Sequence, residues 1–261
     1  MCLKDQLIYH INSLEYLQKQ TRITVYTQEI TRIKTLYKGS ILIYNVSMGT
    51  RKIKKSYISS TGYFASNKNK KQIAFESTLE RDFYTLLEFD SSVLSYEEQP
   101  LTIKYKYLDG NTRKYTPDAL VRYVDGTKKL FEVKYANELN NNLELVEKLD
   151  LLRDIFFNNK GQIFEIFTDE NINKTILKNY NFLYKFSSII KSTEKTLLVE
   201  KTIKKYRNLS IKELLSKLAD TKQDELLFIP YIWNYLYKHL HLIEHTLDKK
   251  LTMSTTIGTG G

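Results

Sequence analysis

The spacing of apolar residues divides the chain into helical and extended segments. Residues 3–19 carry apolar side chains at helical spacing, and 41–46 alternates in the way of a strand. A second helix is predicted to begin near Ser77, because Ser77 lies three residues before Glu80, the spacing of a capping box. This helix is expected to end before Asp90.

From Val93 to Val133 the pattern changes to that of strands, with turn signals at Asp109-Gly110 and Asp125-Gly126. The strands predicted around these turns cover residues 101–107, 115–123 and 129–135. A long helix is then expected over about 137–158, followed by a break at Gly161 and a short buried strand over 163–168.

The chain beyond residue 170 has a mostly helical pattern. Amphipathic helices are predicted over 209–218 and 223–238, and 242–253 resembles two short strands around a turn. This order is typical of a winged helix-turn-helix. We therefore expect four regions: an N-terminal extension of helix and strand, a nuclease-like α/β core, a winged-helix-like domain and a disordered tail, over 1–60, 61–172, 173–254 and 255–261.

The overall charge adds one indication of a partner. The chain of 261 residues has a formal net charge of +10 and a pI near 9.3, which suggests a polyanion, with nucleic acid the leading candidate. Biased lysine and asparagine usage in the source genome would also account for it. The lysine-rich, tyrosine-containing segment 51–71 suits a DNA backbone, and equally a solvated hairpin.

Cysteine and hydropathy exclude several classes of protein. The single cysteine, Cys2, rules out an intrachain disulfide and a cysteine-rich zinc site. No apolar run reaches the roughly 18 residues of a membrane span, and the N-terminus lacks the pattern of a signal peptide. We expect a soluble cytoplasmic protein without a membrane partner.

The residues with the clearest chemistry are two carboxylates and an amine on neighbouring predicted strands. Thr116-Pro117-Asp118 begins one strand, and Phe131-Glu132-Val133-Lys134 lies on the next, after the Asp125-Gly126 turn. Because strand side chains alternate between faces, Glu132 and Lys134 point to one side and Val133 to the core. The hairpin is expected to bring Asp118 beside them.

Such a group suits the hydrolysis of a phosphodiester. Oxygen ligands favour Mg²⁺ or Mn²⁺, and a bound ion can activate water and neutralise charge on the phosphate. We expect two ions, held by Glu80, Asp118, Glu132 and the backbone carbonyl of Val133, with Glu76 as a reserve ligand. Lys134 would orient the water or stabilise the transition state.

The order Pro-Asp, then Glu-X-Lys after a hairpin, is the signature of the PD-(D/E)XK nuclease superfamily, which implies a restriction-endonuclease-like mixed sheet flanked by helices. Within it the chain resembles TnsA, the endonuclease subunit of the transposase of Tn-seven-like transposons. The resemblance spans about residues 65–175. It rests on the following stretches: Phe75 to Glu80, Leu87 to Leu94, Glu97 to Pro100, Tyr115 to Asp118, Phe131 to Lys134 and Phe167 to Asn173.

The resemblance implies catalytic roles for Glu80, Asp118 and Lys134. Glu132 replaces the Gln of the best-known member and is the commoner superfamily residue, while Glu98 and Gln99 lie beside the site. It further implies cleavage at the 5′ ends of a transposon, together with an integrase-type transposase, and binding of an AAA+ ATPase regulator by the C-terminal domain. Residues 1–60 match the family poorly.

Two other functions are weighed against this one. The first keeps the nuclease and changes its context to a phage head-completion, resolvase-like or restriction endonuclease. The second is a non-catalytic DNA-binding or assembly protein with a decayed site, for which loss of Asp118 or Lys134 would be the mark.

Overall fold

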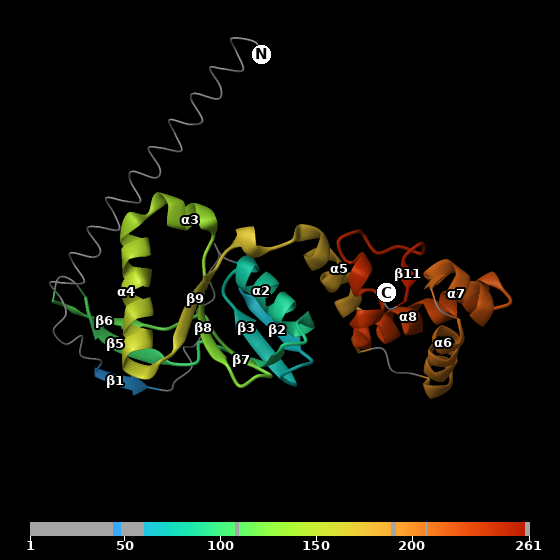
Figure 1. Cartoon of the computed structure of the whole chain (residues 1–261), viewed down its shortest axis with the longest axis horizontal. Coiled ribbons are helices and arrows are strands. Elements are labelled where there is room, and N and C mark those ends of the chain that lie inside the picture. Colours follow the sequence, from blue (N-terminus) through green and yellow to red (C-terminus); the bar gives the residue numbers. More distant parts are fainter. Residues whose placement is uncertain (1–43, 48–59, 108–109, 189–191, 207, 259–261) are drawn as a thin grey trace, which may run out of the picture. The chain divides into compact units, whose positions relative to one another are not determined.

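The computed structural model describes residues 44–47, 60–107, 110–188, 192–206 and 208–258 (Figure 1). The predicted helix over 3–19 and the basic residues 51–59 lie outside these ranges. The chain forms two compact units, one of which contains β1 up to Val46 together with 103–115. Its described strands form one sheet in the order β1-β5-β6: β1 (Tyr44–Ser47), β5 (Thr102–Lys106) and β6 (Thr112–Tyr115).

The second unit is built on a mixed sheet with the strand order β4-β7-β8-β9. Its strands are β4 (Val93–Glu98), β7 (Ala119–Tyr123), β8 (Lys128–Val133) and β9 (Ile163–Phe167). The first three pair antiparallel, and β9 runs parallel to β8. The tight β7–β8 turn forms at Gly126, whose φ of 87° suits glycine. The expected mixed α/β fold is confirmed.

Successive residues of β8 contact opposite layers of the fold. Phe131 and Val133 belong to the core formed with α2 (Thr78–Phe89), which includes Phe83 and Leu87. Leu130 lies opposite Phe164 on β9, on the face that α4 covers. Since both faces are covered, the strand carries apolar residues at consecutive positions, and a charged residue among them needs a partner.

Helix α2 begins where the sequence predicts. The Ser77 hydroxyl accepts a hydrogen bond from the backbone N–H of Glu80, and the helix ends at Phe89. The single helix expected over 137–158 is wrong, because the chain forms α3 (Ala136–Asn141) and α4 (Leu143–Lys160) instead. The break lies at Asn142, whose side chain accepts from the Leu145 N–H and so begins a new helix.

A buried carboxylate connects α2 to the hairpin of β2 (Gly62–Ser66) and β3 (Lys71–Phe75). Glu88 Oε2 accepts hydrogen bonds from the hydroxyls of Ser66 and Tyr96, each at 2.8 Å, and Oε1 accepts from the backbone N–H of Lys68 at 2.8 Å. Three donors from different elements therefore share one carboxylate, which is how a charged group is accommodated in this core.

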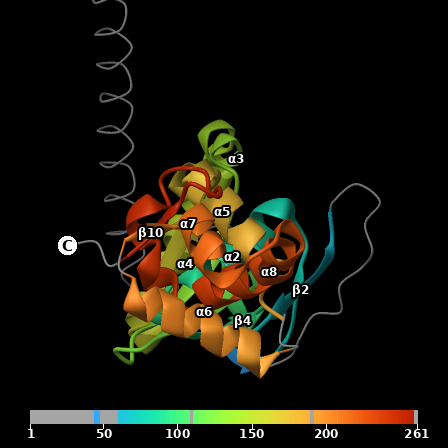
Figure 2. The same ribbon diagram turned by 90° about the vertical axis from the view of Figure 1, so that its right-hand side faces the viewer.

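The C-terminal region is helical, and Figure 2 shows three of its helices, α6, α7 and α8. Its elements are the 3₁₀ turn Asp169–Asn171, α5 (Lys174–Tyr184), α6 (Thr193–Lys205), β10 (Leu209–Ser210), α7 (Ile211–Leu218), α8 (Lys222–Lys238), the 3₁₀ turns Leu240–Leu242 and Glu244–Thr246, and β11 (Thr256–Ile257). The region has its own apolar core around Ile232, Trp233 and Leu236. None of the described helices is long and apolar enough to cross a membrane.

The predicted strand pair over 242–253 is wrong, since these residues form 3₁₀ turns and loops. The strand that pairs in this region is β11, which joins β10 with Leu209 opposite Ile257. Disorder from 255 is also wrong for the described residues up to 258, because Thr255 and Ile257 are buried. Burial of Ile257 explains the order of this segment.

Replacement of Glu88 by Leu is predicted to lower the free energy of unfolding by about 3 kcal/mol or more, because it leaves three donors without their acceptor at about 1–3 kcal/mol each. Urea unfolding of the full chain measures the change. Glu97→Leu is the matched control, because Glu97 forms a partly exposed ion pair with Arg122, and pairs accessible to water contribute about 1 kcal/mol or less. Equal losses in the two variants would contradict the role given to Glu88.

Candidate active site

Asp118 lies just before β7 and is fixed through both its backbone and its side chain. Its N–H donates to the carbonyl of Phe131 at 2.9 Å, and its own carbonyl accepts from the Gln99 N–H at 3.0 Å and the Tyr84 hydroxyl at 3.2 Å. The carboxylate oxygen Oδ2 accepts from the backbone N–H of Val133 at 2.7 Å. The antiparallel register of β7 and β8 thus sets where this carboxylate points.

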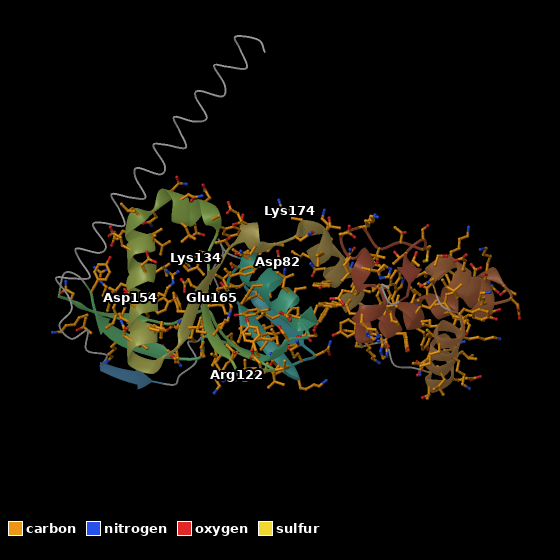
Figure 3. All side chains as sticks on the ribbon, in the orientation of Figure 1. Asp82, Arg122, Lys134, Asp154, Glu165 and Lys174 are labelled. Atoms are coloured by element: carbon orange, nitrogen blue, oxygen red, sulfur yellow. The ribbon has the colours of Figure 1, made fainter. Side chains whose placement is uncertain are left out.

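Glu132 and Lys134 meet Asp118 at the end of β8, where Figure 3 labels Lys134. The Lys134 ammonium nitrogen lies 2.9 Å from Glu132 Oε1 and 3.8 Å from Asp118 Oδ2, and donates to the Val133 carbonyl at 3.2 Å. The Lys134 backbone N–H donates to the carbonyl of Phe167 at 3.0 Å, which extends the β8–β9 pairing. Three oxygens therefore converge on one cationic group.

The alternation of β8 separates this group from the core. Val133 is buried among the apolar residues that pack with α2, whereas Glu132 and Lys134 contact each other on the other side of the strand. The Glu132 side chain is only 7% exposed and that of Asp118 18%. Two carboxylates are thus brought together with little water around them, and their charges require compensation.

Burial and mutual repulsion show in the ionisation of the site. Burial, followed by the charge of Glu132, raises the pKa of Asp118 to about 7, against the opposing effect of Lys134. Burial alone would lower the pKa of Lys134, but the carboxylates of Asp118 and Glu132 outweigh it and raise that pKa above its ordinary value. The ammonium is therefore held charged as the counter-ion of the two acids.

Glu80 lies near this group without joining it. Its Oε2 accepts from the backbone N–H of Glu76 at 2.9 Å and its Oε1 from the Ser77 hydroxyl at 3.2 Å, so both oxygens serve the start of α2. Burial raises the pKa of Glu80, against the opposing charge of Lys134, and the charge of Glu80 in turn raises the pKa of Asp118. The reserve residue, Glu76, accepts from the Gln99 side chain at 3.3 Å.

The oxygens around Lys134 fit a divalent cation by their chemistry. Asp118, Glu132 and the Val133 carbonyl offer oxygens alone, the ligand type that Mg²⁺ and Mn²⁺ prefer. The described residues contain no group of three or more His, Cys, Asp or Glu side chains arranged to hold a metal. The fit therefore depends on two carboxylates with one backbone carbonyl, and no described contact adds Glu80 to them.

Tyr84 and Gln99 both donate hydrogen bonds to the Asp118 carbonyl, and they differ in how far the sequence indicates them. Tyr84, which the sequence analysis missed, lies four residues after Glu80 and so on the same face of α2, which could have indicated it. Gln99, placed beside the site by resemblance alone, has a φ of 44°, in the left-handed region that non-glycine residues rarely adopt. This strained backbone is retained where its N–H reaches the Asp118 carbonyl.

Residues 90–169 match the family described as TnsA-like endonuclease N terminal. The match supports assignment of this segment to the TnsA-like endonuclease family. The matched segment is under a third of the 261 residues and contains Asp118, Glu132 and Lys134, whereas Glu80 lies before it. No curated protein matched the chain.

The match gives the site a coarse assignment. The segment that carries Asp118, Glu132 and Lys134 is similar to the N-terminal domain of TnsA-like endonucleases, which supports a nuclease. The match extends over the β4-β7-β8-β9 sheet and over α3 and α4, and this segment carries the two carboxylates and the lysine.

The pH dependence of stability is predicted to depend on Asp118. Its pKa is 3.8 in its ordinary state and about 7 in the fold, so folding takes up a proton between these values and stability falls as pH rises through about 7. Asp118→Asn should remove this fall, and the stability of the variant relative to wild type should increase between about pH 4 and about pH 7. Thermal unfolding in chelator over this range measures it.

Asp125→Asn is the matched control, because Asp125 is exposed at the β7–β8 turn and its pKa is lowered by the backbone N–H of Thr127. Removal of the Asp125 carboxyl should change the dependence of stability on pH only below about pH 4. Parallel profiles for wild type and Asp118→Asn would contradict the raised pKa of Asp118.

Proposed function

We propose that this protein is a transposition endonuclease that hydrolyses phosphodiester bonds at the 5′ ends of a transposon with the help of divalent metal ions. The observation that carries the proposal is the convergence of Asp118, Glu132 and the Val133 carbonyl on the Lys134 ammonium. The match of residues 90–169 to the TnsA-like endonuclease family supports a DNA substrate. The resemblance in the sequence supports the choice of strand.

Asp118, Glu132 and the Val133 carbonyl would hold Mg²⁺ or Mn²⁺. When bound, the ion would supply Lewis-acid chemistry: neutralisation of phosphate charge and a water of lowered pKa. The hydrogen bond from the Val133 N–H fixes the orientation of the Asp118 carboxylate before any substrate binds. Preorganisation of this kind lowers the cost of assembling the site during the reaction.

Lys134 has the second role in the proposal. Its ammonium balances the two carboxylates in the structure as described, at 2.9 Å from Glu132. Once the carboxylates have another counter-charge, the ammonium is able to turn to a phosphate oxygen or to the attacking water. There it would donate a hydrogen bond to the negative charge that develops in the transition state. Its raised pKa keeps it protonated for this purpose.

Glu80 enters the proposal as a ligand of a second ion. To bind this ion, the Glu80 carboxylate would give up the hydrogen bonds that it accepts from the Glu76 N–H at 2.9 Å and from the Ser77 hydroxyl at 3.2 Å. Its charge raises the pKa of Asp118, and the charge of Lys134 lowers the pKa of Glu80, which supports this role. The same hydrogen bonds make Glu80 the least preorganised of the four proposed catalytic residues.

The partners in the proposal are an integrase-type transposase, which would cut the opposite strand, and an AAA+ ATPase that binds the C-terminal region over 173–254. The separate apolar core of the described helices α5 to α8 supports an independent role for this region. The main alternative is another PD-(D/E)XK nuclease, such as a restriction or resolvase-like enzyme.

Asp118→Ala is predicted to lower magnesium-dependent nicking by at least about 10²-fold, the loss that follows removal of one preorganised electrostatic contact. DNA binding should remain close to that of wild type. Nicking of supercoiled plasmid and a binding titration measure the two effects. Asp125→Ala removes an exposed aspartate of the same sheet and should leave nicking unchanged. Undiminished nicking by Asp118→Ala would exclude this site.

The isolated chain is predicted to cut DNA weakly and without sequence preference, since partners would supply recognition of the transposon ends. Adding the proposed integrase-type transposase partner should raise cleavage and confine it to the 5′ ends. Mapping the cut positions on a labelled transposon end measures both. Rapid cutting at a defined sequence by the chain alone would favour the restriction-enzyme alternative.

A further inference from the structure

The net charge of the protein is unevenly divided between its regions. Residues 61–172 contain 15 Lys and Arg against 19 Asp and Glu, a net charge of −4. Residues 173–261 also contain 15 Lys and Arg but only 8 Asp and Glu, a net charge of +7. A genomic preference for lysine would act on both regions alike. The difference comes instead from the scarcity of acids in the C-terminal region.

This charge distribution makes the region of the proposed active site a poor binding surface for DNA. The region that carries the proposed site is itself negative and holds two buried carboxylates, so it attracts a polyanion weakly. Most of the affinity of proteins for duplex DNA comes from lysine and arginine contacts to phosphates. A positive surface elsewhere in the chain would supply that affinity.

One lysine of α6 and one of α7 lie beside the same aromatic ring. Lys205 lies with its ammonium nitrogen 5.1 Å from the ring centroid of Tyr206, and Lys217 of α7 lies 4.2 Å from the same centroid. Lys201 is exposed one turn before Lys205 on α6. We call these four residues the Tyr206 patch. Figure 2 shows α6 and α7, the helices that carry its lysines.

The charges of the Tyr206 patch are only partly balanced by acids: Glu213 lies one turn before Lys217 on α7, and its pKa is lowered by hydrogen bonds to Ser210 and, to a smaller extent, by the charge of Lys217. Neighbouring lysines of this region are paired, since Lys204 bonds to Glu200, and Lys222 lies 2.8 Å from Glu225. Among the described residues, no carboxylate forms an ion pair with Lys201, Lys205 or Lys217. Two ammonium groups thus share one ring face or edge through cation–π contacts, and a polyanion would relieve their repulsion.

We infer that the Tyr206 patch is a binding surface for the phosphate backbone of duplex DNA. Ammonium groups on flexible stems contact phosphates without reading bases, so binding here is independent of sequence. The ring of Tyr206 serves to hold the lysines. The inference deepens the proposed function, because it takes DNA as the substrate and gives the C-terminal region the task of retaining it.

The test is the salt dependence of binding by the full-length protein to a short fluorescent duplex of mixed sequence. Each phosphate contact contributes a slope of about −0.9 to log K against log salt. Replacing Lys205 and Lys217 with Gln is expected to make the slope shallower by about 1.8, with several-fold weaker binding at low salt. The K205R/K217R variant keeps both charges and should retain the wild-type slope.

The matched control is K222Q/K249Q, which removes two exposed lysines of the same region outside the patch. It should leave the slope nearly unchanged. An equal effect in both double variants would overturn the inference, because it would reflect net charge alone. So would a K205Q/K217Q protein that loses thermal stability but keeps the wild-type slope, as expected if the lysines only complement the carboxyl ends of their helices.

Two further outcomes separate this inference from the proposed function. In the first, K205Q/K217Q shows the predicted change in slope but the wild-type protein does not nick DNA. This result would overturn the nuclease role and support the patch. Nicking abolished by Asp118→Ala, together with no effect of K205Q/K217Q on the slope, would support the nuclease role and overturn the patch. After the second result, an acidic protein surface would be the expected partner of Lys205 and Lys217 in place of DNA.

Discussion

Two carboxylates that share a nearly dry position at the end of β8 constrain the rest of the site. Asp118 and Glu132 are largely buried, and the Lys134 ammonium lies within 4 Å of both. Without a cation at this position, one of the acids would have to be protonated at neutral pH. Lys134 is therefore the counter-ion of the two carboxylates in this structure, and their oxygens are of the type that the proposed metal-dependent cleavage requires.

The elements around these groups act to keep them in place. The β7–β8 register delivers the Val133 N–H to the Asp118 carboxylate, and β9 holds the backbone of Lys134. From outside the hairpin, Tyr84 of α2 and the strained Gln99 both donate to the Asp118 carbonyl. Helix α2 is in turn fixed to the β2–β3 hairpin through buried Glu88. Each contact restricts the freedom of Asp118, as preorganised catalysis requires.

Local signals in the sequence were sufficient for the parts of the site set by neighbouring residues. Ser77 begins α2 because its hydroxyl accepts from an N–H three residues later, and the Asp125-Gly126 turn sets which residues of β7 and β8 face each other. The break at Asn142 was missed because apolar spacing continues across it.

The remaining differences come from contacts between distant parts of the chain. The pairing of Leu209 with Ile257 joins segments that no local pattern connects, so the order of the C-terminal residues could not be predicted. The hydrogen bonds that engage Glu80 are local, but they leave unspecified how near its carboxylate lies to Asp118. A motif gives residue types and spacing, whereas ligand geometry depends on how separate elements pack.

The most direct measurement of the central claim is the position of Mn²⁺ in crystals of the protein, located by anomalous scattering. The proposed site predicts a peak within about 2.1 Å of oxygens from Asp118, Glu132 and Val133, with the Lys134 ammonium moved away from Glu132. A protein that binds Mn²⁺ elsewhere, or not at all, while Lys134 stays between the two carboxylates would contradict a metal-dependent nuclease built on these residues.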